Sequence, residues 1–177
     1  MQTAHELFVH ELTDMLDAER KLVEALGKQA EGAANPQLQK AFLAHQAQTE
    51  KQVQRLEQAF ESIEEQPEQT ECKGIKGLIE EYETFKEDED PSEDILDVFS
   101  IGAAMKVEAY EINAYEGLIR LAREMGHTKA VKLLQQNLKE EQATWKKMNA
   151  FARKIKPEQS GMEEEEGESR RRGRRAA

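Results

Sequence analysis

The stretch from residue 101 to residue 118 decides the fold, and it reads IGAAMKVEAYEINAYEGL. Steps of three and four residues along an α-helix return to the same face. Such steps select one stripe of residues here: Ile101, Ala104, Glu108, Glu111, Tyr115 and Leu118. The stripe has the spacing of a buried helix face, but two glutamates occupy its centre. We therefore expect a long helix that places carboxylates inside a helical core.

Three further segments show the same interrupted pattern. Their stripes are Phe8, Leu12, Met15, Glu19, Leu22 and Leu26; Leu38, Phe42, His45, Thr49, Gln52 and Leu56; and Leu134, Asn137, Glu141, Thr144, Met148, Phe151 and Ile155. Buried carboxylates are costly unless a cation or a proton compensates their charge. Four helices that supply inward carboxylates and a histidine build the metal centres of di-iron and di-manganese bundles. The pattern predicts a metal site, and its candidate ligands are Glu19, Glu111, Glu141, Glu108 and His45.

The composition favours a solvated helical bundle over any β architecture. A length of 177 residues suits one domain with a sizeable core. Of these residues, 38% are apolar, 34% are charged and only four are proline, which is typical of a helical protein. The formal net charge of −11 opposes nonspecific binding to nucleic acid. The single cysteine, Cys72, cannot form an intrachain disulfide. We expect neither a signal peptide nor a membrane-spanning segment. We expect a cytoplasmic protein without a membrane segment.

Capping signals divide the chain into four long helices. The N-terminal signals are Thr3 with Glu6, Asn35 with Pro36, Asp90 with Pro91, and Thr128. Gly126 is expected to close the third helix in a left-handed conformation, and Pro157 to stop the fourth. The four expected helices cover about residues 3–32, 36–63, 90–126 and 128–156.

The lengths of the links predict how these helices are connected. Two links are short, so the helices they join should form antiparallel hairpins, whereas about 25 residues separate the second long helix from the third, enough to cross the bundle. Within this crossover, apolar residues recur at helical spacing: Ile75, Leu78, Ile79, Tyr82 and Phe85. We therefore predict an all-α four-helix bundle with a long crossover that contains a short fifth helix. The apolar face of that helix covers either its own bundle or a subunit interface.

The polar interruptions should also lie at one height in the bundle. Glu19 precedes the turn near residue 34 by about 15 residues, so its level partner on the next helix is near Thr49. Glu111 and Glu141 lie at similar distances on either side of the other turn. Both levels are about 22 Å from their turns at a rise of 1.5 Å per residue. Two hairpins placed side by side would therefore bring the polar groups together.

Several stretches resemble the bacterial YciF/YciE-type stress proteins of the ferritin-like superfamily. They are FVHELTD at 8–14, AERKLV at 18–23, GLIEE at 77–81, KVEAYEI at 106–112 and EEQAT at 140–144. The resemblance covers about 150 residues. It implies a homodimeric four-helix bundle related to rubrerythrin-like di-iron proteins. It also implies that Glu19, Glu111 and Glu141 match the inward acidic positions of the family.

The chain departs from the usual di-iron pattern in ways that leave alternatives open. Ferritin-like di-iron proteins carry Glu-x-x-His on two helices, whereas here the motifs end in Glu111 and Thr144. Gln48 and Trp145 stand where the resembling proteins commonly carry acids, which also permits a mononuclear, weak or vestigial site. Glu108 could instead face solvent or a partner subunit. His45 could be a hydrogen-bonded core histidine.

Two functions follow as hypotheses. The first is an Fe or Mn protein, with one or two ions, that oxidises Fe(II) in a ferroxidase-like reaction during stress. The second is a metal-free bundle that acts as a structural or interaction module. We expect a homodimer that binds metal ions, with residues 1–156 forming the bundle. Residues 157–177 should form a disordered charged tail, and its six acids and five arginines favour a solvated segment over one that contacts nucleic acid.

Overall fold

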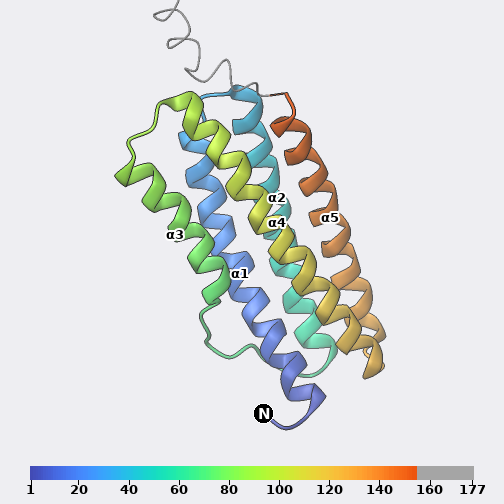
Figure 1. The fold of residues 1–177 in the computed structure, drawn as a ribbon. Coiled ribbons are helices and arrows are strands. Elements are labelled where there is room, and N and C mark those ends of the chain that lie inside the picture. Colours follow the sequence, from blue (N-terminus) through green and yellow to red (C-terminus); the bar gives the residue numbers. More distant parts are fainter. Residues whose placement is uncertain (155–177) are drawn as a thin grey trace, which may run out of the picture.

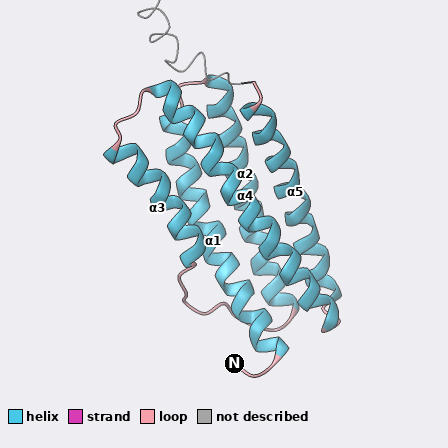
Figure 2. Cartoon of the chain, in the orientation of Figure 1, coloured by secondary structure: helices cyan, strands magenta, loops and turns pink. Residues whose placement is uncertain are grey.

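The computed structural model describes residues 1–154, and these residues form an all-α bundle of four long helices and one short helix (Figure 1). Its helices are α1 (Ala4–Gly32), α2 (Pro36–Ser62), α3 (Lys73–Asp88), α4 (Glu93–Glu124) and α5 (Thr128–Ala152). The described residues contain no strand (Figure 2). The predicted four-helix bundle with a short helix in its long connection is thus confirmed.

The first two helices begin where the capping signals predict. The Thr3 hydroxyl accepts a hydrogen bond from the Glu6 backbone N–H at 3.1 Å, and the Glu6 carboxylate accepts one from the Thr3 N–H at 3.1 Å. At α2, the Asn35 side chain accepts from the Gln37 N–H at 2.9 Å, and Pro36 is the first helical residue. These bonds satisfy backbone donors that have no carbonyl partner within the helix.

The predicted start of the third long helix is wrong. Asp90 has a φ of 42°, which lies in the left-handed region, whereas an N-cap residue adopts an extended backbone. Ser92, with a φ of −59° and a ψ of 155°, is the N-cap instead, and α4 begins at Glu93. Pro91 therefore belongs to the link before α4 and not to its first turn.

The turn between α4 and α5 contains one confirmed prediction and one error. Gly126 closes α4 with a φ of 75°. The His127 N–H donates to the Ala122 carbonyl at 2.9 Å, and the Gly126 N–H donates to the Arg123 carbonyl at 3.1 Å, which is the bond pair of a Schellman cap. Because this cap already includes His127, α5 starts at Thr128, which is its first residue and not its N-cap.

The helices form two antiparallel hairpins, α1–α2 and α4–α5, which lie side by side (Figure 1). α1 packs against α4, and α2 packs against α5. The connection from residue 63 to residue 92 returns along the bundle, and α3 packs on the outside of α1 and α4. Ile75 and Tyr82 of α3 are buried, so the short helix covers its own bundle.

A polar layer separates the two larger of three apolar clusters; the third lies where α3 meets α4. One cluster includes Phe8, Leu12, Leu56, Phe60, Tyr115, Leu118 and Leu134. The other includes Leu26, Leu38, Phe42, Ile101, Ala104 and Met148. On α2, α4 and α5, the polar residues of each stripe fall between members of the two clusters. The polar layer consists of these residues and Glu19 of α1.

The C-terminal boundary of the bundle is only partly described. α5 ends at Ala152. The predicted stop at Pro157, the domain limit at residue 156 and the charged tail of residues 157–177 lie outside the described residues. None of the helices present in residues 1–154 combines the length and the apolar character needed to cross a membrane.

Candidate metal centre

Each of the four long helices contributes buried polar side chains to the layer. They are Glu19 from α1; His45, Thr49 and Gln52 from α2; Glu108 and Glu111 from α4; and Asn137, Glu141 and Thr144 from α5. The four glutamates are 0–1% exposed, and His45 is 5% exposed. This burial follows from the helical spacing of the stripes, which places every stripe residue on the inward face.

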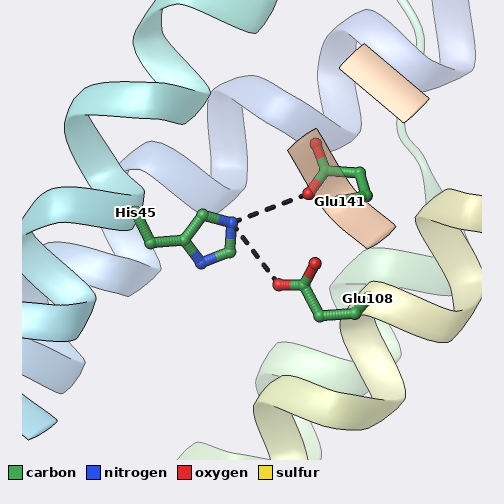
Figure 3. Close-up of side chains that lie close together, drawn as sticks. All are labelled: His45, Glu108 and Glu141. Atoms are coloured by element: carbon green, nitrogen blue, oxygen red, sulfur yellow. Dashed lines mark ion pairs between the residues drawn. The ribbon is translucent and has the colours of Figure 1, made fainter. Parts of the chain in front are cut away.

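Two sets of three ligand atoms meet at Glu141. His45, Glu108 and Glu141 form the first set, and Glu19, Glu111 and Glu141 form the second. Within each set the three atoms lie within 4.8 Å of one another. Figure 3 shows the first set, in which His45 Nε2 is 3.4 Å from Glu108 Oε1 and 3.8 Å from Glu141 Oε2. Glu141 thus lies where it could join two adjacent ion sites.

Most carboxylate oxygens of this cluster lack a hydrogen-bond partner among residues 1–154. Both oxygens of Glu108 and both of Glu111 lack a hydrogen bond, as do Oε2 of Glu19 and Oε2 of Glu141. Of these atoms, Glu108 Oε1 and Glu141 Oε2 face His45 Nε2, as Figure 3 shows. A buried carboxylate without partners strongly destabilises a fold unless it is protonated or paired with a cation. The cluster therefore has carboxylate oxygens that are free to bind a metal ion.

Burial raises the pKa of Glu19, Glu108 and Glu111 well above the usual range of a glutamate. Loss of hydration is the main cause of each shift, and repulsion between the clustered carboxylates adds to it. Without a cation, the cluster holds protons at pH values where exposed glutamates are ionised. A bound cation would displace these protons, because ligation requires deprotonated carboxylates.

Two neutral side chains donate hydrogen bonds to the remaining oxygens, which belong to Glu19 and Glu141. The Tyr115 hydroxyl donates to Glu19 Oε1, and the Gln52 side-chain amide donates to Glu141 Oε1. Each bond fixes one oxygen of its carboxylate and leaves Oε2 free. Hydrogen bonds of this kind orient metal ligands in proteins. Burial also raises the pKa of Tyr115 well above its usual range, so the residue stays a neutral phenol.

A group of hydrogen-bonded side chains next to Tyr115 was not predicted from the sequence. Asn137 donates to the Tyr115 hydroxyl at 2.9 Å and accepts from Arg55 Nη1 at 2.8 Å. Arg55 also binds the Glu140 carboxylate through both terminal nitrogens, at 2.7 and 2.9 Å. Asn137 could have been noticed as a polar residue of its stripe. Arg55 lies outside the stripe of α2, three residues after Gln52, and carries no comparable signal.

The two residues that depart from the acidic pattern lie beside the cluster. Gln48 is half-buried and donates to the Thr144 hydroxyl at 3.3 Å. Trp145 is also half-buried. Neither belongs to the two sets of converging ligand atoms. Glu50 of α2 is exposed.

The structure brings the five predicted ligands into one space. Glu108, which could have faced solvent, is 0% exposed and approaches His45. His45 Nδ1 has no hydrogen-bond partner among the described residues, and its Nε2 faces Glu108 and Glu141. Metal ligation by the five residues stays a prediction.

The fold and the sequence both match known proteins. The crystal structure of the Escherichia coli stress protein YciF matches with a TM-score of 0.82 and 38% identity, over 86% of this chain and 96% of that one. YcfI from Rhodopseudomonas palustris, described as a candidate structural protein, matches with a TM-score of 0.81 and 37% identity, over 84% and 94%.

A sequence comparison gives the same result. Protein YciF of Escherichia coli is 39% identical over 153 residues, which are 86% of this chain and 92% of that protein. The resemblance to YciF-type stress proteins is therefore confirmed. Residues 3–160 match the family described as a domain of unknown function, DUF892. The chain therefore belongs to that family.

Proposed function

We propose that this protein is a ferritin-like metal-binding stress-response protein with a dinuclear iron or manganese site in the polar layer. The observation that carries the proposal is the pair of buried ligand groups that share Glu141: His45 and Glu108 lie on one side of it, and Glu19 and Glu111 lie on the other. The stress context is supported by the E. coli relative, which is described as a stress protein.

The geometry supports one assignment of ligands to two ions. His45 and Glu108 would hold one ion, Glu19 and Glu111 would hold the other, and Glu141 would bridge them. The four carboxylates carry a charge that two divalent cations balance, and this balance offsets the desolvation of the buried charges. At the first site, the imidazole nitrogen of His45 suits iron, whereas calcium and magnesium prefer oxygen ligands alone. The second site offers only carboxylate oxygens, which suit manganese.

The side chains of the cluster define the chemistry that the site could support. When bound, a pair of Fe(II) ions would supply two electrons, which together with two protons from solvent reduce dioxygen to hydrogen peroxide, or hydrogen peroxide to water. The carboxylates favour the more highly charged oxidised state of iron because they are anionic oxygen ligands. Tyr115 and Gln52 hold two of these carboxylates in place, and the apolar clusters on either side exclude bulk water. We therefore propose ferroxidase-like activity without cage-type iron storage.

We also propose that the protein is a cytoplasmic homodimer. α3 lies on the outside of the bundle, and Val98 of α4, next to Phe99, is 40% exposed. Phe99 stacks on Phe85 of α3 with ring centroids 3.7 Å apart, so apolar surface continues from α4 to α3. Light scattering should give a mass near twice the 20.2 kDa of one chain, and a monomer at micromolar concentration would refute the dimer.

A second candidate function is a metal-free structural or interaction module. The R. palustris relative is described as a candidate structural protein, and Gln48 and Trp145 leave the region with fewer acids than resembling proteins carry. In this case the buried glutamates would stay protonated, and the raised pKa values of Glu19, Glu108 and Glu111 are compatible with that state. Measurement of bound metal separates the two functions.

The test uses protein purified without chelator, followed by anaerobic titration with Fe(II) and exposure to air. We expect about two ions per chain and Fe(II) oxidation faster than in buffer. The double variant Glu111→Gln with Glu141→Gln should stay helical, because shape is retained, but should lose tight metal binding. Glu50→Gln with Glu116→Gln is the matched control, since both residues are exposed on helices that carry ligands.

The outcomes decide between the two functions. A parent that binds neither Fe(II) nor Mn(II) contradicts the metal-centre proposal and favours the structural module. A double variant that oxidises Fe(II) as fast as the parent contradicts the assignment of Glu111 and Glu141.

A further inference from the structure

Asn137 is the centre of a hydrogen-bond chain that runs from the bundle surface to Glu19, one of the proposed ligands. Its Nδ2 donates to the Tyr115 hydroxyl at 2.9 Å and to the backbone carbonyl of Gln52 at 3.3 Å. Tyr115 in turn donates to Glu19. One buried amide, 0% exposed, therefore supports the residue that holds the Glu19 carboxylate.

Arg55 determines which way this amide points. A guanidinium group has only donors, so the atom of Asn137 that faces Arg55 Nη1 at 2.8 Å must be the carbonyl oxygen. The NH₂ group is then directed to Tyr115 and Gln52. Arg55 is itself fixed by its two bonds to Glu140, and its side chain is only 12% exposed.

The direction of the Tyr115 proton follows from the direction of the amide. A hydroxyl group has one proton and can accept as well as donate. Because Asn137 donates to the Tyr115 oxygen, the hydroxyl proton is available for Glu19 Oε1. The unpartnered Oε2 of Glu19 is then the atom left for a metal ion.

We propose that Arg55 and Asn137 are positioning residues for the metal centre, which they support by directing the Tyr115 hydroxyl proton toward Glu19. The effect on metal binding rests on the proposed function. The direction of the hydroxyl proton belongs to the hydrogen-bond chain itself and can be tested in the metal-free protein.

The first experiment observes the Tyr115 hydroxyl proton by NMR in metal-free protein labelled on tyrosine. The chain has three tyrosines, so Tyr115→Phe assigns the signal. We expect a downfield, slowly exchanging resonance in the parent. It should shift or disappear in Asn137→Asp, whose carboxylate can only accept a hydrogen bond from Tyr115, and in Arg55→Met, which frees the amide to turn. A resonance that is unchanged in both variants would overturn the proposal.

The second experiment measures Mn(II) affinity in the same proteins. Loss of a group that orients a ligand typically weakens metal binding by about 10-fold to about 100-fold, so Arg55→Met should fall within that range and Arg55→Lys should recover part of the loss. The matched control is Arg20→Met, because Arg20 also bonds a glutamate across α1 and α2, Glu57 at 2.8 Å, but at the exposed surface.

The two experiments separate this proposal from the function on which it rests. Equal Mn(II) affinity in Arg55→Met and Arg20→Met, with a parent that binds metal, would overturn the positioning role alone. A parent that binds no Mn(II) would refute the metal centre, and the NMR signal would still show whether Arg55 and Asn137 direct the Tyr115 proton.

Discussion

The buried glutamates should make the metal-free protein less stable as the pH rises from about 5 to about 8. Burial raises the pKa of Glu19, Glu108 and Glu111 in the folded chain. In the unfolded chain these carboxyl groups ionise at their ordinary pKa of 4.5. Between the two pKa values the native state holds more protons than the unfolded state, so the free energy of unfolding falls with increasing pH.

The number of affected groups sets the size of this effect. Each proton that the native state holds and the unfolded state lacks contributes a slope of about 1.4 kcal/mol per pH unit. Three carboxyl groups therefore give a slope of at most about 4 kcal/mol per pH unit, since coupling spreads the protons over the cluster. Glu111→Gln removes one titrating group and should lower the slope by up to about 1.4 kcal/mol per pH unit. The variant should consequently be more stable than the parent at the upper end of the pH range.

Urea unfolding of chelator-treated protein, followed by circular dichroism at fixed protein concentration, measures these slopes. Glu116→Gln is the control because Glu116 is exposed on the same helix. The difference between Glu111→Gln and Glu116→Gln cancels the contributions of groups elsewhere in the chain. If the parent and both variants show the same pH dependence between about pH 5 and about pH 8, Glu111 does not hold a proton in the buried cluster and the reasoning is refuted.

Two further substitutions test how α3 and the α1–α2 turn are attached. A Cβ atom at Gly74 would lie 2.6 Å from the Tyr110 ring, whereas Gly77 on the same helix has open space around it. In urea unfolding, Gly74→Ala should thus destabilise the protein by about 1 to 3 kcal/mol. Gly77→Ala should stabilise it by about 0.5 to 1 kcal/mol. Equal effects of the two substitutions would contradict the packing of α3. Asp97 accepts hydrogen bonds from the Ala34 and Asn35 N–H groups at 3.1 and 2.8 Å. Asp97→Ala should therefore lower the free energy of unfolding by about 1 to 3 kcal/mol, measured by thermal unfolding. An unchanged unfolding midpoint would show that water replaces the carboxylate.

Helical spacing explains why the inward faces could be predicted from the sequence. Steps of three and four residues fix which side chains share a face, whatever the partner helix is. Glu19, Glu111 and Glu141 were therefore predictable as inward residues, together with the apolar residues beside them. The height of each group followed from the residue rise and the position of the turns.

Helix starts and contacts between helices were less predictable, because they depend on local backbone conformation and on neighbouring elements. The left-handed conformation of Asp90 and the Schellman cap that includes His127 moved two helix starts. The bonds of Arg55 to Asn137 and of Tyr115 to Glu19 depend on the rotation of one helix against another. The sequence pattern of a single helix does not determine how that helix is rotated against its neighbour.

Anomalous diffraction from crystals soaked in Mn(II) tests the central claim most directly, since it locates the metal independently of any activity. The proposed centre predicts two peaks in the polar layer, about 3.5 to 4 Å apart. One peak should lie against His45 and Glu108, the other against Glu19 and Glu111, with Glu141 between them. A single peak would replace the dinuclear site with a mononuclear one. Peaks confined to exposed carboxylates, with the buried glutamates free of metal, would contradict the metal centre.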